Sequence, residues 1–149
     1  MTTPPAVYGQ FGYTLALAER RLTAALRDHL ARRGVEPETW YALRLIATLG
    51  PAASRQAVTD DLAGSRALNA DAARDLLGRL ERDGLIRGDR ELDLTDRGGE
   101  LFTDLRAYIG APAAQLLAQF PLEDIATTVR TLQAVADRAA ADFTAAPAA

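Results

Sequence analysis

The residues with the clearest chemical potential in this sequence are arginines. They supply all 17 basic side chains, because the chain has no lysine. A guanidinium is a planar cation that binds phosphates, carboxylates or base edges through parallel hydrogen bonds. Two groups stand out by their spacing: Arg87 and Arg90 flank a glycine and an acid in a polar turn, and Arg74 lies between Asp71 and Asp75 at helical spacing. The arginines of the first pattern could reach a phosphate, whereas Arg74 could instead pair with a neighbouring acid on the helix surface.

The overall charge limits what these arginines can do. The net charge is −3, and residues 54 to 106 alone carry nine arginines against twelve acids. Proteins that hold nucleic acid by bulk charge are usually basic. Any binding to a phosphate backbone would therefore depend on local clustering of arginines, with weak affinity for random sequences that falls steeply with salt.

Catalytic and metal chemistry find little support in the sequence. The absence of cysteine excludes disulfides, thiolate metal sites and cysteine nucleophiles. The single histidine, His29, lies beside Leu26 and Leu30 in a helical pattern, where a surface or interface role is more common than a ligand role. No glycine-rich loop follows a predicted strand, and no carboxylate pair stands out. We therefore expect no enzyme, no metal site and no cofactor.

Length and hydropathy predict one compact domain, or one fold with two lobes. The chain has 149 residues, of which 48% are hydrophobic, too many for a disordered chain. No apolar run approaches the roughly 18 residues that would span a bilayer, and the first residues lack the features of a signal peptide. A cytoplasmic protein that does not enter a membrane is the expectation.

The hydrophobic spacing predicts a mainly α-helical fold. Residues 1 to 8 should form a loose arm and 144 to 149 a frayed tail. Ser54, Asn69 and Thr95 are suitable N-caps, and the fifth helix should kink or break at Gly110-Ala111-Pro112, because proline removes a helical hydrogen bond. The expected helices cover about residues 10–33, 36–49, 54–62, 69–83, 95–120 and 121–143.

A small β-hairpin interrupts the helices. Gly84 should close the fourth helix. Residues 85–88 and 90–94 then read as two short strands, the second with polar and apolar residues in alternation. Residues 63–67 read as the turn between the third and fourth helices. Two helices joined by a turn and followed by a hairpin form a winged helix-turn-helix.

Four motifs make the resemblance more specific. In chain order they are Glu36-Pro37-Glu38-Thr39-Trp40-Tyr41-Ala42-Leu43-Arg44, Leu80-Glu81-Arg82-Asp83-Gly84-Leu85-Ile86, Leu94-Thr95-Asp96-Arg97-Gly98 and Leu122-Glu123-Asp124-Ile125. In this order and spacing the sequence resembles the MarR family (multiple-antibiotic-resistance regulators) of transcription factors over about residues 10 to 143. The pairing of LExxGLI with LTxxG is the most specific part.

The resemblance implies an obligate homodimer that binds double-stranded DNA. Its regions would be an N-terminal arm and dimerisation helix (1–35), a winged helix-turn-helix (36–106) and C-terminal dimerisation helices (107–149). The apolar stripes Leu15 to Leu30 and Ile125 to Val135 independently call for a partner surface. The alternative is that these two helices cover each other within a monomer.

The candidate DNA contacts depart from the family pattern in three ways. The wing is cut to about three residues, with Arg90 at its tip and Arg87 at its base, and the helix-turn-helix turn is about three residues longer than usual. Asp71 and Asp75 stand where the family usually has hydroxyls and an arginine, and they would repel phosphates unless Arg74 and Arg79 pair with them. The candidate residues are Arg55, Arg66, Asn69, Asp71, Arg74, Asp75, Arg87 and Arg90.

In the resembled family, small ligands bind between the dimer helices and the winged region and alter the spacing of the recognition helices. Aromatic rings and one arginine could line such a site for a small aromatic or anionic effector, although the rings are more often simply core. The candidate residues are Tyr13, Trp40, Tyr41, Arg44 and Tyr108, with Phe11 nearby.

The sequence thus predicts a ligand-responsive, homodimeric, DNA-binding transcriptional regulator. The alternative is a winged-helix protein of the same type that has lost DNA binding and serves as a protein-interaction or small-molecule-binding module. The short wing and the acids of the recognition helix argue for the alternative.

Overall fold

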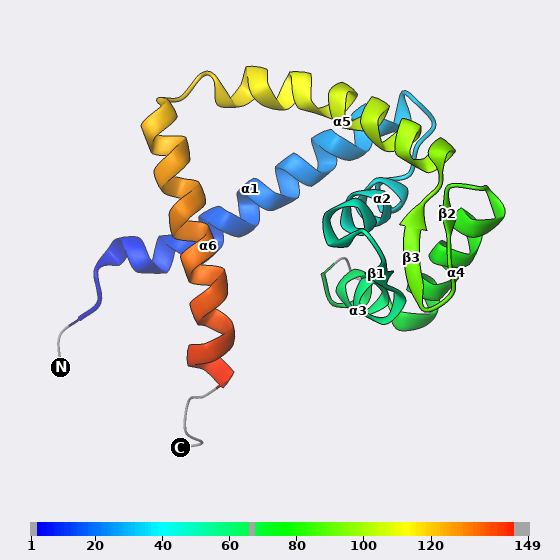
Figure 1. The fold of residues 1–149 in the computed structure, drawn as a ribbon. Helices are drawn as coiled ribbons and strands as arrows, with labels where there is room; N and C mark the ends of the chain where they lie inside the picture. Colours follow the sequence, from blue (N-terminus) through cyan, green and yellow to red (C-terminus); the bar gives the residue numbers. More distant parts are fainter. Residues whose placement is uncertain (1–2, 66–67, 145–149) are drawn as a thin grey trace. The chain divides into compact units, whose positions relative to one another are not determined.

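A computed structural model describes residues 3–65 and 68–144 of the chain (Figure 1). Helices dominate, and three short strands lie in the middle of the sequence. The elements are α1 (Ala6–Ala31), α2 (Pro37–Leu49), β1 (Ala53–Ser54), α3 (Arg55–Ser65), α4 (Ala70–Arg82), β2 (Ile86–Arg87), β3 (Glu91–Leu94), α5 (Asp96–Leu117) and α6 (Leu122–Thr144). The predicted fold class, mainly α with a hairpin wing in a winged helix-turn-helix, is confirmed.

The chain forms two compact units, Met1–Ile109 and Gly110–Ala149. The first contains α1 to α4, all three strands and the greater part of α5. The second contains the end of α5 and helix α6. Every residue that we predicted to contact DNA lies in the first unit.

The core of the first unit lies where α2, α3 and α4 pack around strand β3 (Figure 1). The apolar stripe predicted for α4 is confirmed in full: Ala73, Leu76, Leu77 and Leu80 are all buried. Each fully buried leucine contributes roughly 1.5–3 kcal/mol by leaving water. The largest fully buried side chains are Leu30, Leu43, Ile46, Leu62, Leu77, Leu80, Leu92, Leu105 and Val58.

Side chains cap α3 and α4 as predicted. The Ser54 hydroxyl accepts the Ala57 N–H (3.2 Å) at the start of α3, and the Asn69 side chain accepts the Ala72 N–H (2.7 Å) at the start of α4. The predicted end of α3 is wrong, since the helix continues to Ser65. Residues 63 to 65, expected in a turn, are helical because Ala63-Gly64-Ser65 contains no residue that must break a helix.

The hairpin belongs to a three-stranded antiparallel sheet in the order β1-β3-β2. Strands β2 and β3 pair Ile86 with Leu94, as a hairpin should. Strand β1, which the sequence analysis missed, pairs Ala53 with Leu92 along the other edge of β3. A strand of two residues is too short to show an alternation of polar and apolar side chains in the sequence. It can be recognised only from its pairing with β3.

The two halves of the LExxGLI and LTxxG pairing meet directly. The Thr95 hydroxyl donates to the Gly84 carbonyl (2.6 Å) and accepts the Gly98 N–H (3.0 Å), which caps α5 as predicted. The Thr95 N–H donates to the Leu85 carbonyl (3.1 Å). Gly98 is buried so closely that a side chain there would overlap the Leu85 carbonyl oxygen. Both motifs therefore form one joint between the end of α4 and the start of α5.

Helix α5 passes through Pro112 without a break, so the helix break considered at residues 110–112 does not occur. Proline has no N–H, and its absence leaves the carbonyl four residues earlier, that of Tyr108, without its helical partner. His29 Nε2 lies 2.9 Å from this carbonyl oxygen. A carbonyl can only accept, so Nε2 carries the proton and donates. The helix continues because a side chain from α1 satisfies the group that proline leaves free.

Helix α1 begins at Ala6, about four residues before the predicted start, so the expected loose arm is shorter. Proline is tolerated immediately before a helix, and the Tyr8 N–H already bonds to the Pro5 carbonyl (3.0 Å). Much of the apolar surface of α1 and α6 is exposed. The large exposed side chains on these two helices are Val7, Tyr8, Phe11, Tyr13, Leu15, Leu22, Leu122, Val129 and Val135.

Candidate nucleic-acid interface

Helix α4 presents a polar face beside its buried leucines. Asp71, Arg74 and Asp75 are exposed on this face, in the first turns of the helix. Arg74 Nη1 lies 2.7 Å from Asp71 Oδ1, as predicted, with the two side chains 63% and 89% exposed. A pair so exposed contributes at most about 1 kcal/mol. Arg74 can therefore exchange Asp71 for another anion at little cost.

Arg79 does not pair with Asp75, the partner considered from the sequence. Its Nη2 lies 2.9 Å from Glu36 Oε2, at the residue that precedes α2. The pair borders a groove of about 600 Å³ between the start of α2 and the outer face of α4, where Asp75 and Arg82 also lie. Consequently Asp75 lacks the counterion that the sequence suggested.

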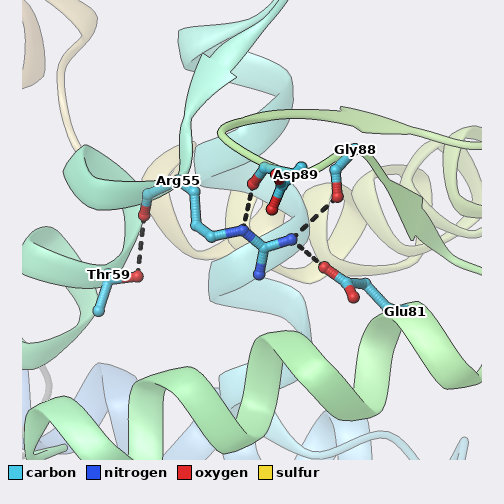
Figure 2. Close-up of polar contacts among 5 residues, drawn as sticks. All are labelled: Arg55, Thr59, Glu81, Gly88 and Asp89. Atoms are coloured by element: carbon cyan, nitrogen blue, oxygen red, sulfur yellow. Dashed lines mark hydrogen bonds and ion pairs between the residues drawn. The ribbon is translucent and has the colours of Figure 1, made fainter.

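Arg55, at the start of α3, is occupied by the wing (Figure 2). Its guanidinium donates to the carbonyl oxygens of Asp89 and Gly88, the latter over 3.0 Å. It also forms an ion pair with Glu81 of α4. The side chain of Arg55 is 31% exposed. A residue predicted to touch DNA thus has its Nε and Nη2 donors committed within the protein.

The tip of the wing comprises Gly88, Asp89 and Arg90, between β2 and β3. Gly88 has φ +115°, and a side chain there would overlap the Glu91 carbonyl oxygen, so the turn requires glycine. Arg87 and Arg90 are exposed on either side of the turn. Their side chains make no hydrogen bond or ion pair among the described residues. They are the two guanidinium groups of the wing that remain available to a phosphate.

The other predicted DNA contacts lie around the start of α4. The Asn69 oxygen is used for the helix cap, which leaves its amide nitrogen as the donor. Arg66 lies outside the described residues. Sequence reasoning missed the roles of Glu36 and Glu81, because each pairs with an arginine far away in the chain and no local spacing reveals such a pair.

The predicted ligand residues fall into separate places. Trp40 and Tyr41 are buried in the core, and Arg44 stacks over both rings at 5.9 and 5.7 Å from their centroids. Tyr108 instead stacks on His29, with a centroid separation of 3.8 Å. Tyr13 is exposed on α1. Only Trp40, Tyr41 and Arg44 form one cluster.

The described part of the chain contains neither a cluster of metal-binding side chains nor a membrane-spanning helix. Residues 3–65 and 68–144 contain no group of three or more histidine, aspartate or glutamate side chains placed to hold a metal ion. None of the helices in these ranges combines the length and apolar character needed to cross a bilayer.

A recognition helix that follows a capped helix and turn, with a hairpin behind it, defines a winged helix-turn-helix protein. Comparison with solved structures narrows the fold to that of the MarR family. A MarR family protein from Bacillus stearothermophilus matches with a TM-score of 0.72 and 19% identity over 93% of this chain and 99% of that chain. The resemblance inferred from the sequence is confirmed at the level of the fold.

Two further matches were solved with bound partners. The Mycobacterium tuberculosis MarR family protein Rv2887, in complex with p-aminosalicylic acid, matches with a TM-score of 0.69 and 22% identity over 89% of this chain and 99% of that chain. The same protein in complex with DNA gives a TM-score of 0.66 and 22% identity over 89% and 98%. No protein-family model matches the sequence, and no curated protein does either.

Proposed function

We propose that this protein is a homodimeric, DNA-binding transcriptional regulator of the MarR type. The observation that carries the proposal is the pairing of an exposed, capped recognition helix with a wing that has two free arginines. Arg74 on α4 would face the major groove, and Arg87 and Arg90 would reach the backbone or the minor groove, where arginine is favoured by the negative potential. The solved DNA complex of a protein with this fold supports the assignment.

The remaining candidate contacts have narrower roles. Asn69 has a free amide nitrogen to donate to phosphate, and Arg66 would lie beside the backbone. Asp71 and Asp75 could accept a cytosine amino group, a rarer contact than arginine to guanine. Residues 36 to 106 would form the DNA-binding region, and the protein would act in the cytoplasm.

Dimerisation is supported by the uncovered apolar surface of α1 and α6. Leu22 is 54% exposed on α1, and Val129 is 48% exposed on α6. Several large apolar side chains exposed along one helix are typical of protein interfaces. Residues 1–35 and 107–149 would supply the dimer contacts, as the resemblance implies.

A small aromatic or anionic effector would adjust DNA binding. The complex of a protein of this fold with p-aminosalicylic acid supports this class of ligand. In this chain Arg44, exposed over Trp40 and Tyr41, combines a cation with aromatic rings. A ligand that prefers one spacing of the two recognition helices would shift the dimer toward it by its differential affinity.

The first experiment is a titration of the purified protein against the DNA upstream of its own gene. A scrambled duplex of the same length serves as the control, and both are measured at low and near-physiological salt. Tight binding with a clear preference over the scramble is expected. Arg90→Ala should lower the affinity for both duplexes by roughly tenfold and reduce the slope of log K against log salt by about 0.9.

A second function is favoured by one observation: Asp75 is exposed without the expected arginine, in a winged region that carries more acids than arginines. A protein of this kind would use the same fold to bind another protein or a small molecule. Absence of binding to either duplex at low salt would support this alternative and refute the regulator.

A further inference from the structure

Arg55 binds three consecutive carbonyl groups at the tip of the wing. Its guanidinium donates to Gly88 and Asp89 (Figure 2), and its backbone N–H donates to Arg90 over 2.8 Å. The guanidinium also holds Glu81 on the recognition helix. One residue at the start of α3 thus connects the wing tip to α4.

A tip of three residues has little structure of its own. Strand β2 has two residues and β3 has four, so few ladder bonds fix the turn. The positive φ of Gly88 sets the direction of the chain but not its position. The position of Arg90 relative to α4 therefore depends on the bonds that Arg55 makes across the gap.

We propose that Arg55 is a positioning residue for DNA recognition, which places Arg90 relative to the recognition helix and does not itself contact DNA. The proposal rests on the proposed function. By occupying the carbonyl oxygens of Gly88 and Asp89, Arg55 also keeps these partial negative charges away from the phosphates that Arg90 would meet. Glu81 holds the guanidinium in place and neutralises its charge.

The geometry calls for arginine in particular. A guanidinium carries five N–H donors in a rigid planar fork, and here separate nitrogens serve Asp89 and the pair of Gly88 and Glu81. A lysine ammonium carries the same charge on a single nitrogen, so it cannot reproduce this fork. A direct phosphate contact, in contrast, would tolerate lysine, which binds phosphate as a point charge. The Arg55→Lys variant therefore distinguishes a residue that positions the wing tip from one that contacts phosphate directly.

The first test is a double-mutant cycle on DNA affinity and its salt dependence. Arg55→Lys, Arg90→Ala and the double variant are compared with the wild type, and Arg106→Lys on α5 is the matched control. Arg55→Lys is expected to lose affinity to nearly the extent of Arg90→Ala, about tenfold, and the double variant to lose no more than either. Wild-type affinity in Arg55→Lys, or additive losses in the double variant, would overturn the positioning role.

A second test needs no DNA. Trypsin cleaves after arginine, so its attack at the Arg87–Gly88 and Arg90–Glu91 bonds reports how firmly the tip is held. Mass spectrometry of the folded protein under limiting trypsin should show several-fold faster cleavage at these bonds in Arg55→Lys and in Arg55→Met. Cleavage at the wild-type rate in both variants would refute the proposal. If the wild type binds no DNA, the regulator fails, yet this readout still decides whether Arg55 holds the wing.

Discussion

His29 and Tyr108 are bound to each other twice. His29 Nε2 donates to the Tyr108 carbonyl (2.9 Å), and the Tyr108 hydroxyl donates to the His29 carbonyl (2.7 Å). Their rings stack with an angle of 8° between the planes. Each bond satisfies a carbonyl that lacks a helical partner, since His29 lies in the last turn of α1 and Tyr108 lies four residues before Pro112. The pair joins the end of α1 to the middle of α5.

This relationship predicts energetic coupling between His29 and Pro112. His29→Ala should lower the free energy of unfolding by about 1–3 kcal/mol, because it leaves a carbonyl unsatisfied and removes a stacked ring. In a Pro112→Ala background the Tyr108 carbonyl regains a helical N–H, so the same change should cost about 1 kcal/mol less. Urea unfolding at one fixed protein concentration measures all four forms.

The control for this cycle is Asp28→Ala, one residue away on the same helix and exposed. Its cost should be the same with proline or alanine at position 112. An equal cost of His29→Ala in both backgrounds would show that His29 does not compensate for the proline.

The sequence predicted those parts of the fold that local chemistry determines. The buried stripe of α4, the caps at Ser54 and Asn69 and the end of α4 before Gly84 follow from residues within one turn of each other. Two of the errors arose where a distant residue decides the outcome. Pro112 does not break α5 because His29 bonds to the freed carbonyl, and strand β1 exists only through β3.

In the candidate site, too, contacts between neighbouring residues were predictable and contacts between distant residues were not. The pairing of Arg74 with Asp71 was predictable, because three residues separate them on one helix. The partners of Arg79 and Arg55 were not, since Glu36 and Glu81 lie 43 and 26 residues away in the chain. The sequence therefore identified the arginines but could not say which of them are free to bind DNA.

The joint between Gly98 and Leu85 predicts opposite effects at two adjacent glycines. Gly98→Ala should destabilise the protein by about 3 kcal/mol, the upper end of what overpacking typically costs, because its methyl group would overlap the Leu85 carbonyl oxygen. Gly99→Ala meets open space within the same helix and should stabilise it by up to about 1 kcal/mol. Thermal unfolding of both variants measures this. Equal midpoints would contradict the close approach at Gly98.

The proposed dimer predicts a change of mass when a charge is placed on the exposed apolar surface. Leu22→Glu and Val129→Glu should each yield monomers in sedimentation analysis, because an unpaired carboxylate is costly to bury in an interface. Ala134→Glu adds the same charge at an exposed position on the other side of α6 and should leave the mass unchanged. A wild type that sediments as a monomer would exclude the homodimer altogether.

The ion pair between Asp71 and Arg74 predicts that loss of an acid strengthens DNA binding. Asp71→Asn removes a negative charge from the proposed groove face and frees Arg74. Affinity for both the upstream and the scrambled duplex should rise about fivefold, because one pair of unit charges about 4 Å apart in water interacts by about 1 kcal/mol. The cost to stability is small, about 0.3–1 kcal/mol, from the lost interaction with the helix dipole.

Fluorescence anisotropy with both duplexes distinguishes this expectation from base recognition by Asp71. Asp28→Asn on α1 makes the same charge change away from the groove face and should alter the affinity little. If Asp71 instead accepts a cytosine amino group, Asp71→Asn would weaken binding to the upstream duplex and leave the scramble unchanged. That result would reverse the role assigned to the carboxylate, because the acid would then contribute to specificity and Arg74 would be its positioning partner.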